Sequence, residues 1–81
     1  MDESEKFIRK NFPSLLSHNR VKSEIAELAG EWSIHMINYI HTMPRNIEFS
    51  VILQNGATVI QVMGKIHRET EKFSGVTIKQ I

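Results

Sequence analysis

The chain has 81 residues, of which 41% are hydrophobic and 23% are charged, and its formal net charge is +1 at pH 7. This length fits one small domain over residues 1–81, and the balanced charge excludes a strong general attraction to nucleic acid or anionic lipid. The absence of cysteine excludes disulfides and thiolate-bound zinc, and it fits a reducing compartment such as the cytoplasm.

A short helix is predicted over residues 2–11. Acidic Asp2 and Glu3 stand at its N-terminal end and basic Arg9 and Lys10 at its C-terminal end, an order that the helix dipole favours. Pro13 disfavours helical geometry at Phe12, so this helix is expected to end before Phe12.

The longest periodic segment predicts a second helix over residues 20–43. Its apolar residues recur in steps of three or four, which is the spacing of one helix face. They are Val21, Ile25, Leu28, Trp32, Met36, Tyr39 and Met43. Further isoleucines and alanines widen this apolar arc beyond one face, and Pro44 is expected to end the helix.

Residues 47–53 predict a strand. Ile47, Phe49 and Val51 alternate with Glu48 and Ser50, so one side of the strand is apolar and the other is polar. A further strand is predicted over residues 76–81, with the sequence VTIKQI.

The segment between these two strands has two interpretations. Its apolar residues keep a helical spacing, which predicts a helix over residues 57–74. They are Val59, Ile60, Met63, Ile66 and Phe73. The Asn55-Gly56 pair between two apolar runs instead favours a β-hairpin. We place the helix first and keep the hairpin as the alternative for residues 57–66.

Together the elements predict an α+β fold with two N-terminal helices followed by a strand–helix–strand unit. Such a unit joins two parallel strands through a right-handed crossover. Two strands make an incomplete sheet with open edges. We therefore expect the sheet to be completed by formation of a homodimer.

The sequence holds no motif typical of an enzyme. It has no G-x-S-x-G turn and no glycine-rich phosphate loop. Glu27, Glu31 and His35 would share one face of the long helix, but this spacing also describes an ordinary solvent-exposed row. No apolar run approaches the ~18 residues of a membrane span. The prediction is a non-catalytic protein with no catalytic residue, metal or cofactor and no membrane contact.

The first predicted binding surface lies on the long helix. It consists of Trp32, Met36, Tyr39 and Met43. Methionine and aromatic side chains are common in adaptable protein interfaces, so this surface is expected to contact a second copy or another protein. The expected function is that of a small regulatory or adaptor protein that binds another, unidentified protein and acts as a homodimer.

The second predicted surface lies on the outer side of the helix at 57–74. It consists of Gln61, Lys65, Arg68 and Lys72. Three cations in one row could contact a phosphate backbone. Nucleic-acid binding is therefore the alternative function.

Overall fold

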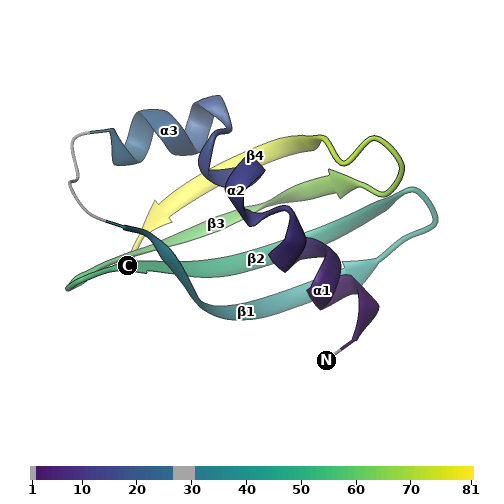
Figure 1. Cartoon of the computed structure of the whole chain (residues 1–81), viewed down its shortest axis with the longest axis horizontal. Coiled ribbons are helices and arrows are strands. Elements are labelled where there is room, and N and C mark those ends of the chain that lie inside the picture. The colour runs from purple at the N-terminus through teal and green to yellow at the C-terminus, as the bar shows by residue number, and fades with distance from the viewer. Residues whose placement is uncertain (1, 27–30) are drawn as a thin grey trace.

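A computed structural model describes residues 2–26 and 31–81 of the chain. Within these ranges, three helices precede four strands (Figure 1). The helices are α1 (Glu3–Lys10), α2 (Phe12–Leu16) and α3 (Asn19–Ile25), and the strands are β1 (Ser33–Thr42), β2 (Asn46–Asn55), β3 (Thr58–His67) and β4 (Phe73–Gln80).

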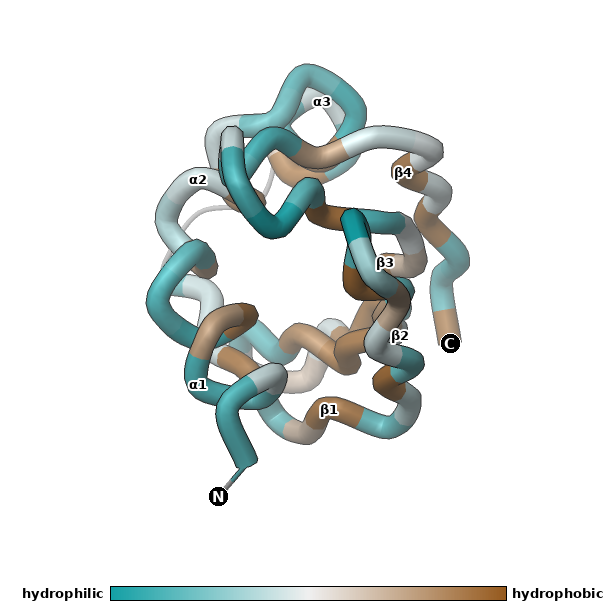
Figure 2. Tube along the Cα trace, turned by 90° about the vertical axis from the view of Figure 1, so that its right-hand side faces the viewer, coloured by the Kyte–Doolittle hydropathy of each residue, from teal (hydrophilic) through white to brown (hydrophobic). Residues whose placement is uncertain are grey.

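The strands form one antiparallel sheet in the order β1-β2-β3-β4, so each strand pairs with its neighbours in the sequence. The helices lie against one face of this sheet, with α1 at β1 and α3 at β4 (Figure 1). Viewed along the strands, the sheet curves around the side that carries the helices (Figure 2). No helix of the described residues covers the opposite face, which we call the open face.

The predicted fold is wrong from the second helix onward. The structure has neither a helix over residues 20–43 nor a strand–helix–strand unit. Instead, α3 ends at Ile25 and β1 begins at Ser33. Residues 27–30 of the predicted helix lie outside the described residues. Since one chain supplies four paired strands, no second copy is needed to complete the sheet.

The helix predicted at 2–11 is present as α1, for the local reasons that the sequence suggests. The Asp2 side chain accepts a hydrogen bond from the backbone N–H of Glu5 at 2.8 Å, which caps the helix. Arg9 pairs with Glu5 one turn away at 3.3 Å. The strand predicted at 47–53 lies within β2, and the strand predicted at 76–81 overlaps β4.

Two β-bulges explain why β1 has the sequence pattern of a helix. The residues of β1 that pack towards the helices are Ile34, Ile37 and Ile40, which are three positions apart. Their partners on β2 are two positions apart, as in a regular strand. The difference arises because His35 and Asn38 are extra residues on β1. The bulges thus give a strand the apolar spacing that predicts a helix.

The hairpin alternative is correct for residues 57–66, and the helix predicted at 57–74 is wrong. Asn55 pairs with Thr58, so only two residues connect β2 to β3. Gly56 is the first of them and has a φ of +61°, a left-handed conformation that glycine adopts without steric cost.

The hydrophobic core lies between the helices and the inner face of the sheet. Each helix contributes one fully buried side chain, and the central strands contribute most of the rest. The helical residues are Ile8, Leu15 and Val21, and the strand residues are Ile47, Phe49, Val51, Leu53, Ile60, Val62, Ile66 and Val76.

A polar contact ties the helices to the turn between β3 and β4. The Glu71 carboxylate lies 3.1 Å from the ammonium of Lys10 and accepts a hydrogen bond from the Asn11 side chain at 3.2 Å. These contacts, the Lys10 hydrogen bond foremost, hold the pKa of Glu71 below its usual value. Glu71 has a φ of +58°, so this contact holds a strained backbone in place.

Candidate functional site

The candidate site is the open face of the sheet. Residues that pair across neighbouring strands point to the same face, so the register defines its members. They include Met36, Tyr39 and His41 on β1, Glu48, Ser50 and Ile52 on β2, and Val59, Gln61, Met63 and Lys65 on β3. Asn38, the extra residue of the second bulge, joins them at the edge.

Apolar side chains make up an unusual share of this face. Met36 is 48% exposed and Tyr39 is 52% exposed. Beside them, Ile52 is only 8% exposed although no helix of the described part of the chain covers it. Val59 and Met63 are half-buried on the neighbouring strand. A solvated sheet face normally carries polar residues at such positions.

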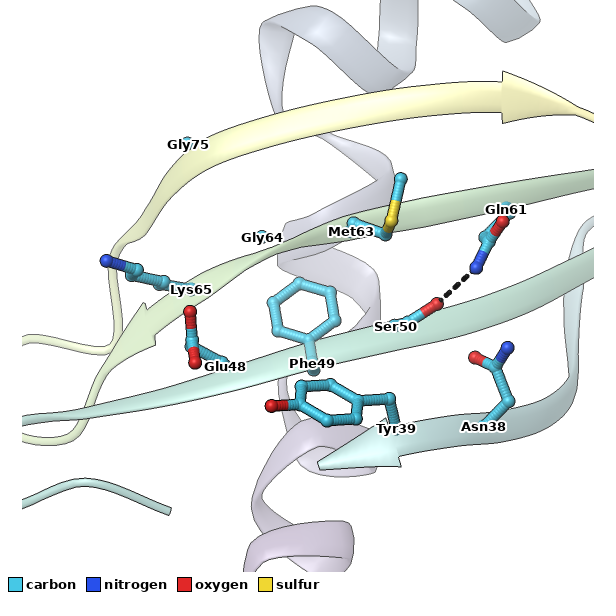
Figure 3. Close-up of a pocket in the computed structure, with 10 residues that line it drawn as sticks. All are labelled: Asn38, Tyr39, Glu48, Phe49, Ser50, Gln61, Met63, Gly64, Lys65 and Gly75. Atoms are coloured by element: carbon cyan, nitrogen blue, oxygen red, sulfur yellow. Dashed lines mark hydrogen bonds between the residues drawn. The ribbon is translucent and has the colours of Figure 1, made fainter. Parts of the chain in front are cut away.

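A shallow depression of about 440 Å³ lies near the middle of the open face (Figure 3). Tyr39 and Asn38 stand on one side, and Met63 and Lys65 stand on the other, with Glu48 between them. The bulge at Asn38 and another between β3 and β4 flank it. Bulges re-aim side chains, so they help to place this group.

One polar pair on this face is already satisfied. The Gln61 amide donates a hydrogen bond to the Ser50 hydroxyl at 2.7 Å (Figure 3). Ser50 is only 5% exposed, so this bond removes the cost of burying its hydroxyl.

Glu48 and Lys65 also face one another across β2 and β3, but unlike Ser50 and Gln61 they do not interact, since they form no ion pair. They are direct register partners. Among the described residues, the ion pairs within 4.0 Å all involve other side chains. In Figure 3 the Lys65 ammonium extends away from the Glu48 carboxylate. Both charges therefore remain free to meet something outside the chain.

The four residues predicted as a helical interface do not form one surface. Met36 and Tyr39 lie together on the open face. Trp32 precedes β1 and packs against the core, and its buried indole N–H has no hydrogen-bond partner among the described residues. Met43 lies in the turn after β1, where its carbonyl accepts a hydrogen bond from Arg68 at 3.0 Å. Their role as an interface stays a prediction.

The predicted basic row also divides, because the helix that would align it is absent. Gln61 and Lys65 lie on the open face of β3. Arg68 and Lys72 lie in the turn that follows. There the Arg68 guanidinium donates to the carbonyls of Met43 and Pro44, at 3.0 and 3.4 Å. Arg68 therefore joins the turn after β3 to the turn after β1.

The second hollow of the surface, about 240 Å³, lies where these two turns meet. Its His67 ring serves the local fold, since Nδ1 accepts hydrogen bonds from the backbone N–H groups of Glu69 and Thr70, both at 3.2 Å. The backbone N–H of Arg68 donates to the carbonyl of Arg45 at 2.8 Å. These contacts explain the conformation of the turns without a ligand.

The described residues contain no cluster of metal-binding side chains. No three of their histidine, aspartate and glutamate side chains are placed to hold a metal ion. Glu27 of the acidic row considered above lies outside the described residues. The helices of this part of the chain are too short or too polar to cross a membrane.

The sequence contains a signal for part of this site. The alternation in residues 47–53 already places Glu48 and Ser50 opposite the apolar side of the strand. Asn38 and Met63 could not be found in the same way. Asn38 belongs to a bulge that interrupts the alternation of β1, and Met63 lies on β3, which has apolar residues on both faces.

Comparisons with known proteins identify no relative. No protein-family model matches the chain, and neither a curated protein nor a solved structure is significantly similar to it.

Proposed function

We propose that this chain is a non-catalytic regulatory or adaptor protein of the cytoplasm that works as a homodimer, with the open face as its interface. The observation that carries the proposal is the row of exposed Met36 and Tyr39 over half-buried apolar neighbours on a sheet face without cover. Tyrosine and methionine are enriched at protein interfaces. The absence of cysteine supports a reducing compartment such as the cytoplasm.

The size of the face supports a second copy as its occupant. The two longer dimensions of the chain are 36 and 24 Å. A face with this outline can supply roughly the 800 Å² that each partner contributes to a standard interface. Covering it would also add a second hydrophobic layer to a chain whose short length limits its core.

The edges of the sheet are poorer places for a partner than its face. The edge strand β1 has two bulges, and β4 carries an extra residue opposite Gly64. Bulges at the edge interrupt the regular row of N–H and C=O groups that another strand would need. Dimerisation through an added strand is therefore disfavoured, and packing of one open face on another is favoured.

The test is the molar mass of the purified chain in solution, measured by sedimentation equilibrium from about 5 to 500 μM, a range that brackets common dissociation constants of weak dimers. We expect the mass of two chains, and we expect Tyr39→Glu to give the mass of one because it would bury an unpaired charge. Ser14→Glu, which adds the same charge at an exposed position of α2, serves as the control. A monomeric parent chain across this range would refute the proposal.

Nucleic-acid binding has weaker support as a second candidate. Lys65 and Lys72 remain without an ion-pair partner among the described residues, but they lie on different elements. Fluorescence anisotropy with duplex DNA and single-stranded RNA, at about 50 and 200 mM salt, tests it. Binding that weakens steeply with salt and is lost in the Lys65→Gln, Lys72→Gln double variant would favour this function over the first.

A further inference from the structure

We infer that Glu48 of each protomer pairs with Lys65 of the second copy, so that two identical ion pairs fix how the two open faces meet. This inference rests on the homodimer proposed above, and it names the contacts that give that dimer its orientation. It concerns only residues of this chain and a partner with the same sequence.

The first step is that neither the Glu48 carboxylate nor the Lys65 ammonium has a charged partner within the described chain. Glu48 and Lys65 are direct neighbours across the two central strands, where opposite charges usually interact within the sheet. Neither side chain has a hydrogen bond or an ion pair with the rest of the described chain, and the Lys65 side chain extends away from the carboxylate (Figure 3). Each therefore presents an unpaired charge beside the apolar side chains of the face.

The second step is symmetry. In a two-fold dimer, if one residue contacts another in the second copy, the reverse contact forms as well. Consider a two-fold axis that lies between the two faces and runs along the strands, midway between β2 and β3. Rotation about this axis places β2 of one copy over β3 of the other. Glu48 then lies over Lys65 of the second copy, and Lys65 lies over Glu48.

The third step is that the same axis centres the two open faces on each other. Because β2 and β3 are the central strands of the sheet, the axis passes through the middle of the open face. It brings Ser50 over Met63 of the second copy, next to the charged pair in the strand register. A dimer shifted sideways by one strand would instead place Glu48 over Glu48, or Lys65 over Lys65. Like charges so placed disfavour the shifted arrangement.

Charge reversal tests the inference, with sedimentation equilibrium as the measurement. Glu48→Lys alone places two cations opposite each other, and Lys65→Glu alone places two carboxylates opposite each other. We expect each single variant to raise the dissociation constant at least about tenfold. The double variant exchanges the charges and restores the pairs, so it should dimerise within about threefold of the parent chain.

A mixture of the two single variants is the sharper measurement. In a mixed dimer, both cations of the Glu48→Lys chain would meet both carboxylates of the Lys65→Glu chain, so each contact again joins opposite charges. We expect the mixture to form mixed dimers at concentrations where each variant alone is monomeric. One variant carries a fluorescent label, so that the mixed species is identified by its sedimentation. Rescue on mixing cannot arise from the Glu48–Lys65 contact within a single chain.

The possible results distinguish a failure of the ion pairs from a failure of the proposed homodimer. If the parent chain dimerises and Tyr39→Glu prevents it, but both charge reversals dimerise like the parent, the ion pairs are refuted and the interface stands. If the parent chain is monomeric, both fail. If circular dichroism shows either reversal to be unfolded, the neutral variants Glu48→Gln and Lys65→Gln replace them. A dissociation constant unchanged in both neutral variants would also overturn the inference.

Discussion

At the scale of single residues, Glu71 combines an unfavourable backbone with favourable side-chain contacts. Its positive φ suits glycine or asparagine better than glutamate. Its carboxylate, however, joins Lys10 and Asn11 of the helical layer to a turn of the sheet. The contacts thus compensate for local strain and connect segments far apart in the sequence.

Glu71→Gln is expected to lower the melting temperature more at pH 7 than at pH 3. The carboxylate has a lowered pKa in the folded chain, so its contribution is complete above its ordinary value of 4.5 and disappears as the pH falls through the folded pKa. Thermal unfolding followed by circular dichroism measures both differences. Glu69→Gln is the control, since Glu69 has no ion pair among the described residues. An equal effect of Glu71→Gln at both pH values would contradict this assignment.

Two glycines of the sheet are needed for different physical reasons. A Cβ on Gly64 would lie 3.2 Å from the Ser74 carbonyl oxygen and 3.3 Å from Val76 Cγ2. A Cβ on Gly75 would meet nothing within 4 Å, but its φ is +59°. The first position is restricted by space and the second by backbone conformation.

Gly64→Ala is therefore expected to destabilise the fold by about 1–3 kcal/mol through overpacking. Gly75→Ala should cost about 1–2 kcal/mol through its left-handed backbone, and Gly75→Asn should cost less, because asparagine tolerates that conformation. Urea denaturation measures all three. If Gly75→Asn were no better than Gly75→Ala, strain would not be the reason for glycine there.

At the scale of elements, the sequence predicts regular segments well and irregular ones poorly. β2 alternates without interruption between apolar and polar residues along residues 47–51, and the strand predicted there is correct. In β1, two extra residues change the apolar spacing from two to three, which resembles a helix. In β3, Val59 and Met63 make the open side apolar as well, so alternation is lost.

These two failures have a common origin in the open face. The bulge at Asn38 places a side chain at the rim of the depression, and Met63 forms part of its lining. Features that hid the strands from sequence patterns are therefore the features that build the candidate interface. Such conflicts between local pattern and fold are expected at functional surfaces. Only the Asn55-Gly56 turn, which favours a hairpin on its own chemistry, pointed to the correct topology.

Deleting the bulge residues tests whether they protect the edge of the sheet. Removing His35 and Asn38 together would leave Ile34, Ile37 and Ile40 alternating regularly, with the same residues facing the core. We expect the variant to keep its β-sheet circular dichroism but to aggregate at lower concentration by light scattering, because β1 then offers an uninterrupted edge. Deleting Ser50 is the control. It lies in a regular strand, so its loss reverses the faces of half of β2 and should unfold the chain.

At the scale of the whole molecule, the fold has two layers and one uncovered surface. The helical layer supplies one fully buried side chain from each short helix, and the sheet supplies the rest of the core. On the other side no helix of the described chain covers the sheet, and Met36 and Tyr39 are about half exposed. If a second copy covers that side, part of the stability of the fold belongs to the dimer.

The melting temperature should therefore depend on protein concentration. When only the folded form dimerises, mass action stabilises it as the concentration rises. For a chain of this size, a tenfold increase is expected to raise the melting temperature by roughly 3–5 °C. Differential scanning calorimetry at several concentrations measures the slope for the parent chain, for Tyr39→Glu and for the Ser14→Glu control.

Tyr39→Glu should remove this slope, whereas Ser14→Glu should keep it. The comparison separates a dimer from a general effect of added charge, because both variants add one carboxylate, on the open face in Tyr39→Glu and on the helical layer in Ser14→Glu. A slope that persists in Tyr39→Glu would mean that the chain associates through another surface. A flat parent curve with a high melting temperature would mean that two layers suffice, and that the apolar side chains of the open face do not stabilise a dimer.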